Sequence, residues 1–363
     1  MSQGLPQEFP AALWQDICAA DQEDNERCAY LAKESIYWAD GRHPDDLGQL
    51  LDALRGARAY GVSLEIIEAA WNSSAPQAFR AQVAQDWVGT VLYGLNDPEG
   101  AIVVAQHVGK TAHEMGPGFL SDFSDLMMEW GLLEAAYTIL SELIVKTPGD
   151  LSVRYNLGTC EKFRGDWTAA MEAFEFVSRH EDAGGLVYHN LLIAAIASQD
   201  QIRIDSAMAS IQGLDDPVQW NLGEIIQVEF KSEESGHPVE VLFAERVAPH
   251  QVRLRGLPVS KELPPFDSMV LIDLQPQRYA GTDDNHRLIF PVLKVVEVSG
   301  YETLTHVVGE TEQRDAVCTI LEEQNIPARA DGEHQILIAV TTETRSKVTE
   351  LLAKLSVISR AQH

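Results

Sequence analysis

One short stretch carries the residue types of a phosphate-binding loop. It reads His107-Val108-Gly109-Lys110-Thr111 and so contains the Gly-Lys-Thr of a Walker loop, in which backbone amides and the lysine hold nucleotide phosphates. The loop also requires a glycine five residues before Gly109, where this chain has Val104. The stretch lies inside an apolar helical run with no strand before it. The sequence therefore predicts no nucleotide site at this position.

Other patterns that support catalysis are incomplete. His113-Glu114 begins the motif of a zinc-protease helix, but no histidine follows three residues later. The chain has no GxSxG nucleophile turn, no GxGxxG after a strand and no paired Glu-x-x-His for two irons. We therefore predict that the protein is not an enzyme and holds no cofactor or metal ion.

The cysteines and histidines are dispersed along the chain. None of the cysteines forms a CxxC pair or has clustered histidines beside it: Cys18, Cys28, Cys160 and Cys318. This usage suits buried free thiols in a reducing cytoplasm better than a disulfide framework or a zinc site. Four histidines of the C-terminal part could converge in the folded chain: His237, His250, His286 and His306. An enzyme with its site in that part is the third of our functional hypotheses.

The charge balance bears on the kind of partner. The chain has 27 basic and 55 acidic residues, a net charge of −28, and most of the surplus lies before about residue 225. A field of this sign repels nucleic acid and anionic lipid and attracts basic partners. Acidity can also serve only to keep a cytoplasmic protein soluble, or reflect a salty habitat. No apolar stretch is long enough for a membrane helix, and the N-terminus lacks the features of a secretory signal, so we expect a cytoplasmic protein that binds neither membrane nor nucleic acid.

The chain has two regions whose sequence patterns predict different secondary structure, and these elements must position any functional side chains. Up to about residue 212, long apolar-periodic stretches broken by short turns predict helices, and all seven tryptophans lie before residue 221. From about residue 227, short β-branched runs between Gly-, Pro- and Asp-rich breaks predict strands. We therefore predict a helical domain over 1–222, a mainly β subdomain over 223–300 and an α+β subdomain over 301–363.

The middle of the chain contains an internal repeat with an offset of 34 residues. When 117–150 is set above 151–184, the residue types agree at the turn between two helices, at a small residue where the helices approach, and at a bulky residue that fills the gap to the next unit. The matched residues are Gly131 over Gly165, Ala136 over Ala170, and Leu140 over Phe174. One helix pair cannot bury its apolar face alone, so such units stack into a continuous core.

These positions resemble the tetratricopeptide repeat (TPR). The resemblance is clear over 117–184, continues in a degenerate unit over 185–212, and extends upstream to a divergent unit over 85–112, while 11–73 reads as helices that match the motif poorly. It implies an all-α solenoid whose groove, lined by the first helix of each unit, binds a segment of a partner protein. The alternative is an irregular helical bundle in which the 34-residue match is a coincidence.

Several polar residues on the first helices are candidates for partner binding. Asp122, Asp125 and Glu129 recur at helical spacing and could form an acidic strip for a basic ligand, although a solvated helix face explains them as well. The second unit carries residue types that grip a backbone or a carboxylate: Arg154, Asn156 and Lys162. The residues that we expect to lie outside the core are Ser121, Asp122, Asp125, Arg154, Asn156 and Lys162. The fuller basic and amide set of repeats that capture a C-terminal carboxylate is missing.

The sequence pattern of the C-terminal region predicts two small folded parts. Residues 238–298 contain four or five strands without a helix, as in a small barrel or sandwich. The order strand, helix, strand, strand, helix over 301–357 makes up most of a ferredoxin-like unit. It is similar to small bacterial modules, some of which act in signalling and some in the rings of secretion machinery. A sheet with two helices that packs on the barrel or dimerises is an equal alternative.

Three functions are compatible with this reading. The first is an intracellular adaptor or chaperone-like scaffold, which holds a partner segment in the repeat groove and uses its C-terminal region for a second partner or for self-association. The second is a regulatory sensor whose C-terminal α+β module binds a small molecule. The third is the enzyme with a site in the β region.

Overall fold

A computed structural model of the chain describes residues 44–361 apart from 57, 74–75, 113–114, 181–183, 215–219, 232–237, 277, 281–286 and 310. Six residues discussed above lie outside the described residues: Cys18, Cys28, His113, Glu114, His237 and His286. The helices expected in the first 43 residues lie outside them as well. The chain divides into two compact units, 1–164 and 165–363. Each is considered by itself.

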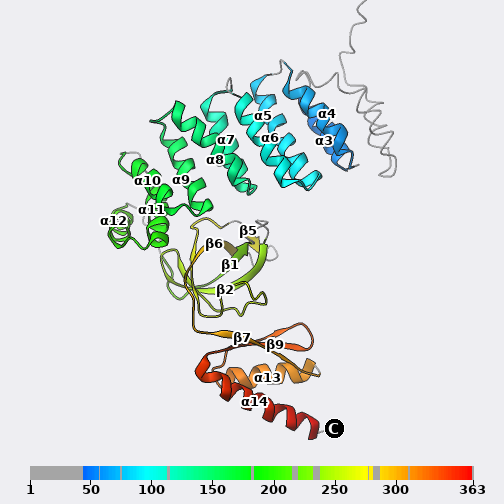
Figure 1. Cartoon of the computed structure of the whole chain (residues 1–363), viewed down its shortest axis with the longest axis vertical. Helices are drawn as coiled ribbons and strands as arrows, with labels where there is room; N and C mark the ends of the chain where they lie inside the picture. The colour runs from blue at the N-terminus through cyan, green and yellow to red at the C-terminus, as the bar shows by residue number, and fades with distance from the viewer. Residues whose placement is uncertain are drawn as a thin grey trace, which may run out of the picture. The chain divides into compact units, whose positions relative to one another are not determined.

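Helices make up the whole described part of the first unit and the beginning of the second (Figure 1). Those of the first unit are α3 (Pro44–Gly56), α4 (Tyr60–Trp71), α5 (Gln77–Gly89), the π-helical turn η2 (Thr90–Gly94), α6 (Pro98–Thr111), α7 (Gly116–Glu129), α8 (Leu133–Lys146) and α9 (Leu151–Arg164). The second unit begins with α10 (Trp167–Ser178), α11 (Gly185–Ser198) and α12 (Gln201–Gln212). The predicted all-α repeat is confirmed.

The 34-residue register is visible in the backbone of the turns. Gly131 follows α7 with a φ of +77°, and Gly165 follows α9 with a φ of +78°. This left-handed conformation has little steric cost only for glycine, which is why both units place glycine there. In the degenerate unit Gln199 takes the same place with a φ of +57°. The small and bulky residues of the motif are fully buried, as the repeat requires: Ala136, Ala170, Leu140 and Phe174.

The helices of the first unit share one continuous apolar core. It runs from Leu51 in α3 through Ile66 and Val88 to Phe123 in α7 and on to Cys160 in α9. The upstream unit predicted over 85–112 is present as a helix pair, but its first helix, α5, begins earlier, at Gln77. Its second helix, α6, has Asp97 as its N-cap, whose side chain accepts a hydrogen bond from the amide of Gly100 at 2.9 Å.

The strands after α12 close into a barrel. They are β1 (Ile225–Lys231), β2 (Pro238–Ala248), β3 (Gln251–Leu254), β4 (Met269–Ile272), β5 (Arg278–Ala280) and β6 (Arg287–Glu297). Neighbours are antiparallel in the order β1-β2-β3-β4-β6, and β1 pairs in parallel with β6, so five strands form a closed ring, with β5 paired to β6 outside it. Alternate residues fill the interior, among them Val228, Leu242 and Val270. Of the two folds predicted here, the barrel is the one that forms.

The last residues form the predicted βαββα module. Its elements are β7 (Glu302–Val307), α13 (Thr311–Glu323), β8 (Ala328–Asp331), β9 (Gln335–Val340) and α14 (Thr342–Ala361). The strand order is β7-β9-β8 with antiparallel neighbours, so β7 and β8 run parallel on either side of β9. The apolar faces of the sheet and of both helices enclose a core that includes Leu321, Ile338 and Val348. No helix among the described residues is long and apolar enough to cross a membrane.

Candidate protein-binding site

A π-helical turn extends the first helix of the pair α5/α6. At the end of α5 the amide of Leu95 donates to the carbonyl of Thr90 at 3.1 Å, five residues back. Such turns are rare and occur frequently at functional sites. The turn leaves Tyr93 65% exposed. It also brings Gly94 against Tyr60, because a Cβ atom at Gly94 would lie only 2.7 Å from the Tyr60 ring.

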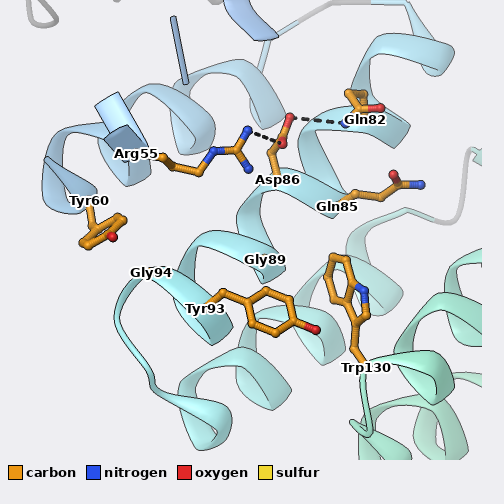
Figure 2. Close-up of a pocket in the computed structure, with 9 residues that line it drawn as sticks. All are labelled: Arg55, Tyr60, Gln82, Gln85, Asp86, Gly89, Tyr93, Gly94 and Trp130. Atoms are coloured by element: carbon orange, nitrogen blue, oxygen red, sulfur yellow. Dashed lines mark hydrogen bonds and ion pairs between the residues drawn. The ribbon is translucent and has the colours of Figure 1, made fainter. Parts of the chain in front are cut away.

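A cavity of about 320 Å³ lies beside this turn (Figure 2). Its walls come from the end of α3, the start of α4, the α5–η2 helix and the residue that follows α7. The lining residues are Arg55, Tyr60, Gln82, Gln85, Asp86, Gly89, Tyr93, Gly94 and Trp130. Gln82, Asp86, Gly89 and Tyr93 recur at helical spacing and so present one face of α5–η2 to the cavity. Because several helices build it, no single segment of the sequence encodes this pocket.

Aromatic rings form one side of the cavity. Tyr93 and Trp130 pack edge to face, with ring centroids 5.7 Å apart and an angle of 79° between their planes. Trp130 packs against α5 at Gly89, where a Cβ atom would lie 3.4 Å from the indole, in ordinary van der Waals contact. Tyr60 lines the cavity near Gly94.

A nearly buried carboxylate forms the other side. Asp86 is 9% exposed, and burial raises its pKa, while the positive charge of Arg55 opposes the rise. Arg55 makes its short contact, 2.6 Å, with Asp52, and its nitrogen is 3.4 Å from Asp86. The amide of Gln82 is 3.5 Å from Asp86. These contacts of Asp86 are longer than a good charge-assisted hydrogen bond, so the carboxylate keeps capacity to accept another donor.

The predicted acidic strip lies on the helix that leads to Trp130. Asp122, Asp125 and Glu129 are all exposed along α7. Partial desolvation raises the pKa of Asp125, and the like charges of Asp122 and Glu129 add to the rise, whereas a hydrogen bond with Asn156 opposes it. The three side chains thus form a locally negative surface whose mutual repulsion a cation would relieve.

The residues predicted on α9 lie differently. Asn156 is 9% exposed, and its amide donates to the hydroxyl of Ser121, also buried, at 3.1 Å; Lys162 is 3% exposed, with its ammonium 4.6 Å from the Phe163 ring centroid. The expectation that Ser121, Asn156 and Lys162 lie outside the core is wrong. For Ser121 and Asn156 the reason is that α7 and α9 pack side by side and bury the polar residues between them. Arg154 is half-buried and donates to the carbonyl of Pro148 at 3.3 Å.

The second unit contains a cavity of its own, of about 620 Å³, in the barrel. Its walls are Glu224, Ile225, Ile226, Gln227, Arg246, Leu288 and Phe290. Arg246 is 6% exposed, and its guanidinium carbon lies 5.2 Å from the Trp220 ring centroid and 5.6 Å from that of Phe290. Burial lowers the pKa of Arg246, and Glu224, 3.6 Å away, opposes this effect.

A buried histidine pair contacts Trp220, the ring that Arg246 also contacts. Nδ1 of His189, in α11, is 3.2 Å from Nε2 of His250, at the β2–β3 turn, and both rings pack edge to face against Trp220. Burial lowers the pKa of His189. His250 thus meets a histidine of the helical part, 61 residues away in sequence, and His306 lies apart from this pair in β7.

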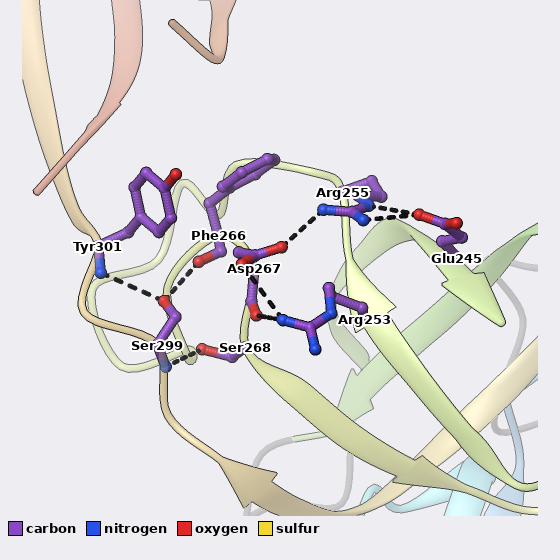
Figure 3. Close-up of polar contacts among 8 residues, drawn as sticks. All are labelled: Glu245, Arg253, Arg255, Phe266, Asp267, Ser268, Ser299 and Tyr301. Carbon is purple, nitrogen blue, oxygen red and sulfur yellow. Dashed lines mark hydrogen bonds and ion pairs between the residues drawn. The ribbon is translucent and has the colours of Figure 1, made fainter. Parts of the chain in front are cut away.

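The barrel is fastened to the C-terminal module by polar and aromatic contacts (Figure 3). The hydroxyl of Ser299 donates to the carbonyl of Phe266 at 2.5 Å, and the rings of Phe266 and Tyr301 pack 5.3 Å apart. On the adjoining barrel surface, Asp267 accepts from Arg255 at 2.6 Å and from Arg253 at 3.3 Å. The connection between the two folds is therefore held by specific contacts.

Among the described residues no three histidine, cysteine or acidic side chains are grouped as metal ligands would be. Cys160 is buried as predicted; burial raises its pKa to about 12, and its thiol donates to the carbonyl of Leu133 at 3.5 Å. Cys318 is a free, half-buried thiol, and burial raises its pKa too.

No protein-family model matches the chain, and no curated protein matches it. The solved structures to which the chain is similar include the following three, each with a TM-score of 0.31. The C-terminal part of a TPR repeat-containing protein from Cytophaga hutchinsonii is 15% identical and covers 54% of this chain and 76% of its own. MamA from Desulfovibrio magneticus RS-1 is 13% identical and covers 49% and 99%, and BtubC from P. vanneervenii is 15% identical and covers 59% and 97%. The helical part is a TPR-like repeat. This assignment follows from the chain's own turns and buried motif residues, and such distant likenesses add no argument about function.

Proposed function

We propose that the protein is an interaction scaffold that binds a segment of a basic partner protein on the exposed face of α5–η2 and α7. The observation that carries the proposal is the cavity at Asp86, Tyr93 and Trp130, which lies on the first helices of successive pairs. In repeats of this kind the first helices line the groove. Protein interfaces are enriched in aromatic side chains, and binding sites are usually concave. The exposed Tyr93 beside this cavity has both features.

The acidic strip supports a basic partner. Partial burial and then the like charges of Asp122 and Glu129 raise the pKa of Asp125, and the whole chain has a net charge of −28. A basic segment would neutralise this surface and would be steered toward it before contact. We place this binding inside the cell and assign the protein no catalytic step.

The test compares three synthetic peptides of equal length, one rich in lysine, one neutral and one rich in glutamate, by titration calorimetry against the full chain. The lysine-rich peptide should bind most tightly and lose affinity with added salt. The variant Asp122→Asn/Asp125→Asn/Glu129→Gln should weaken its binding about tenfold.

A matched control has the same net charge as that variant. It neutralises three exposed residues of the C-terminal module by Glu322→Gln/Glu323→Gln/Glu333→Gln. Equal weakening by both triple variants would show that only total charge matters, and would overturn the assignment of the binding surface to α7. Failure of the lysine-rich peptide to bind at all would overturn the proposal itself.

The barrel cavity favours a second candidate function, a sensor of a small molecule. Arg246 offers a fixed, desolvated cation in a partly apolar cavity of about 620 Å³, which suits a small organic carboxylate. This places the ligand in the barrel, whereas the sequence hypothesis placed it in the module over 301–363. Screening small carboxylates for a rise in melting temperature that Arg246→Gln abolishes would test it. If no carboxylate raises the melting temperature of the parent chain, this candidate is withdrawn.

A further inference from the structure

The cavity on the helical unit also has a chemistry of its own. We propose that it receives the cationic head of one lysine or arginine side chain of the bound segment, between the aromatic rings and the carboxylate of Asp86. This inference rests on the proposed function and assigns a residue type to the centre of that interface.

The aromatic side of the cavity can attract a cation. A ring face carries partial negative charge and attracts an ammonium or guanidinium group within about 6 Å of its centre. Because Tyr93 and Trp130 meet edge to face, they do not cover each other as stacked rings would. Tyr60 lines the same cavity, so three aromatic residues contribute to its walls.

The carboxylate side selects positive charge. Asp86 is shielded from water, yet its contacts with Arg55 and Gln82 are 3.4 and 3.5 Å long. A cation of the ligand would give it a short, charge-assisted partner. An apolar side chain would shield Asp86 further without supplying a donor. An anionic one would meet the like charge of Asp86, beside which Arg55 also lines the cavity.

The space is large enough for one long side chain. A cavity of about 320 Å³ is at the small end of ligand sites, which hold about 300–1,000 Å³. Both lysine and arginine have long apolar stems that can lie along the aromatic walls while the charged head reaches the carboxylate.

The test uses lysine-rich peptides that differ only at one central position, occupied by lysine, norleucine or glutamate. The parent chain should prefer central lysine to norleucine by about tenfold. Tyr93→Leu should remove most of that preference, and Tyr93→Phe should keep it, because phenylalanine retains a ring face. Tyr93 is largely exposed, so neither variant disturbs the core. Asp86→Asn should also reduce the preference, and its melting curve reports whether it folds.

The outcomes separate this inference from the proposed function. If the peptides bind in a manner that needs the acidic strip, but central lysine and norleucine bind equally to the parent chain, the cation site is overturned and the scaffold stands. A preference for lysine that survives Tyr93→Leu would likewise overturn it. If none of the peptides binds the parent chain, both proposals fail together.

Discussion

Each of the two compact units has a cavity lined by a nearly buried charged residue and by aromatic rings, but the charges have opposite signs. In the helical unit the charge is Asp86, beside Tyr93 and Trp130; in the second unit it is Arg246, beside Trp220 and Phe290. Burial raises the pKa of Asp86 and lowers that of Arg246, so in both cases it disfavours the ionised form. Each is partly compensated by one neighbour, Arg55 or Glu224.

The opposite charges indicate which kind of ligand each unit can bind. A desolvated carboxylate with long contacts favours a cation, and a desolvated guanidinium favours an anion. A single chain with both sites could hold a basic protein segment on its helices and a small acid in its barrel. The following experiments separate the two sites, in order of decreasing expected effect.

The largest effect should come from removing the core beneath the helical site. Phe123 is fully buried in α7, and Phe123→Ala should destabilise the helical unit by about 3–5 kcal/mol, through lost burial and the cavity left behind. Hydrogen exchange should rise in peptides from α5 and α7 while β1 and β2 stay protected. Phe243→Ala, at a position 43% exposed, is the matched control and should cost far less. Equal exposure of barrel peptides after Phe123→Ala would show that the two sites do not respond separately.

A smaller effect should come from filling the space between the π turn and α4. Gly94→Ala places a Cβ atom 2.7 Å from the Tyr60 ring, which must move. Overpacking of this kind costs about 1–3 kcal/mol, and displacement of Tyr60 should also weaken binding of the peptide with central lysine. In Gly118→Ala the new methyl group meets no atom within 4 Å, so helix propensity should leave stability unchanged or raise it by up to about 1 kcal/mol. Urea denaturation measures both, and equal stability of the two variants would show that the Tyr60 contact is not rigid.

The barrel site should respond to acid through its histidine pair. Burial lowers the pKa of His189 below its ordinary value of about 6.5, so below that pH the unfolded chain binds a proton that the folded chain does not. Stability of the second unit is therefore full above about pH 6.5 and declines as the pH falls below it. Melting temperatures at several pH values measure the decline, which His189→Gln should reduce. His180→Gln, at an exposed histidine, should leave the decline unchanged. An unaltered pH profile in His189→Gln would remove the pair as its source.

The sequence revealed the periodic features of the fold better than the sites. The glycine turns at Gly131 and Gly165 and the buried Ala170 follow from a 34-residue period, and the βαββα order follows from local patterns. The acidic strip on α7 could be predicted from the helical spacing of its three acidic residues, all of which are exposed to solvent.

What the sequence could not reveal depends on neighbours. The sequence predicted that Asn156 and Lys162 lie outside the core, but both are buried. Their burial depends on packing between helices, which a local sequence pattern does not reveal. The π turn depends on a one-residue change in hydrogen-bond register after Gly89, and the cavity needs Arg55 and Trp130, 75 positions apart in the printed sequence. Tyr93, in η2, is the one available signal, and single exposed aromatics are too common to identify a site.

The smallest effect should appear within the acidic strip itself. Asp122 and Glu129 both raise the pKa of Asp125, so Asp122→Asn should lower that pKa, measurable by carboxyl chemical shifts in an NMR titration. Removing one like charge from neighbouring turns of a helix should also stabilise α7 by about 0.2–0.5 kcal/mol at low salt, and salt should erase the gain by screening. Glu142→Gln, at an exposed position of α8, provides the control and should leave Asp125 unchanged. If Asp122→Asn does not shift the pKa of Asp125, the strip does not act as one negative surface, and the preference of the helical unit for cations would rest on the Asp86 cavity alone.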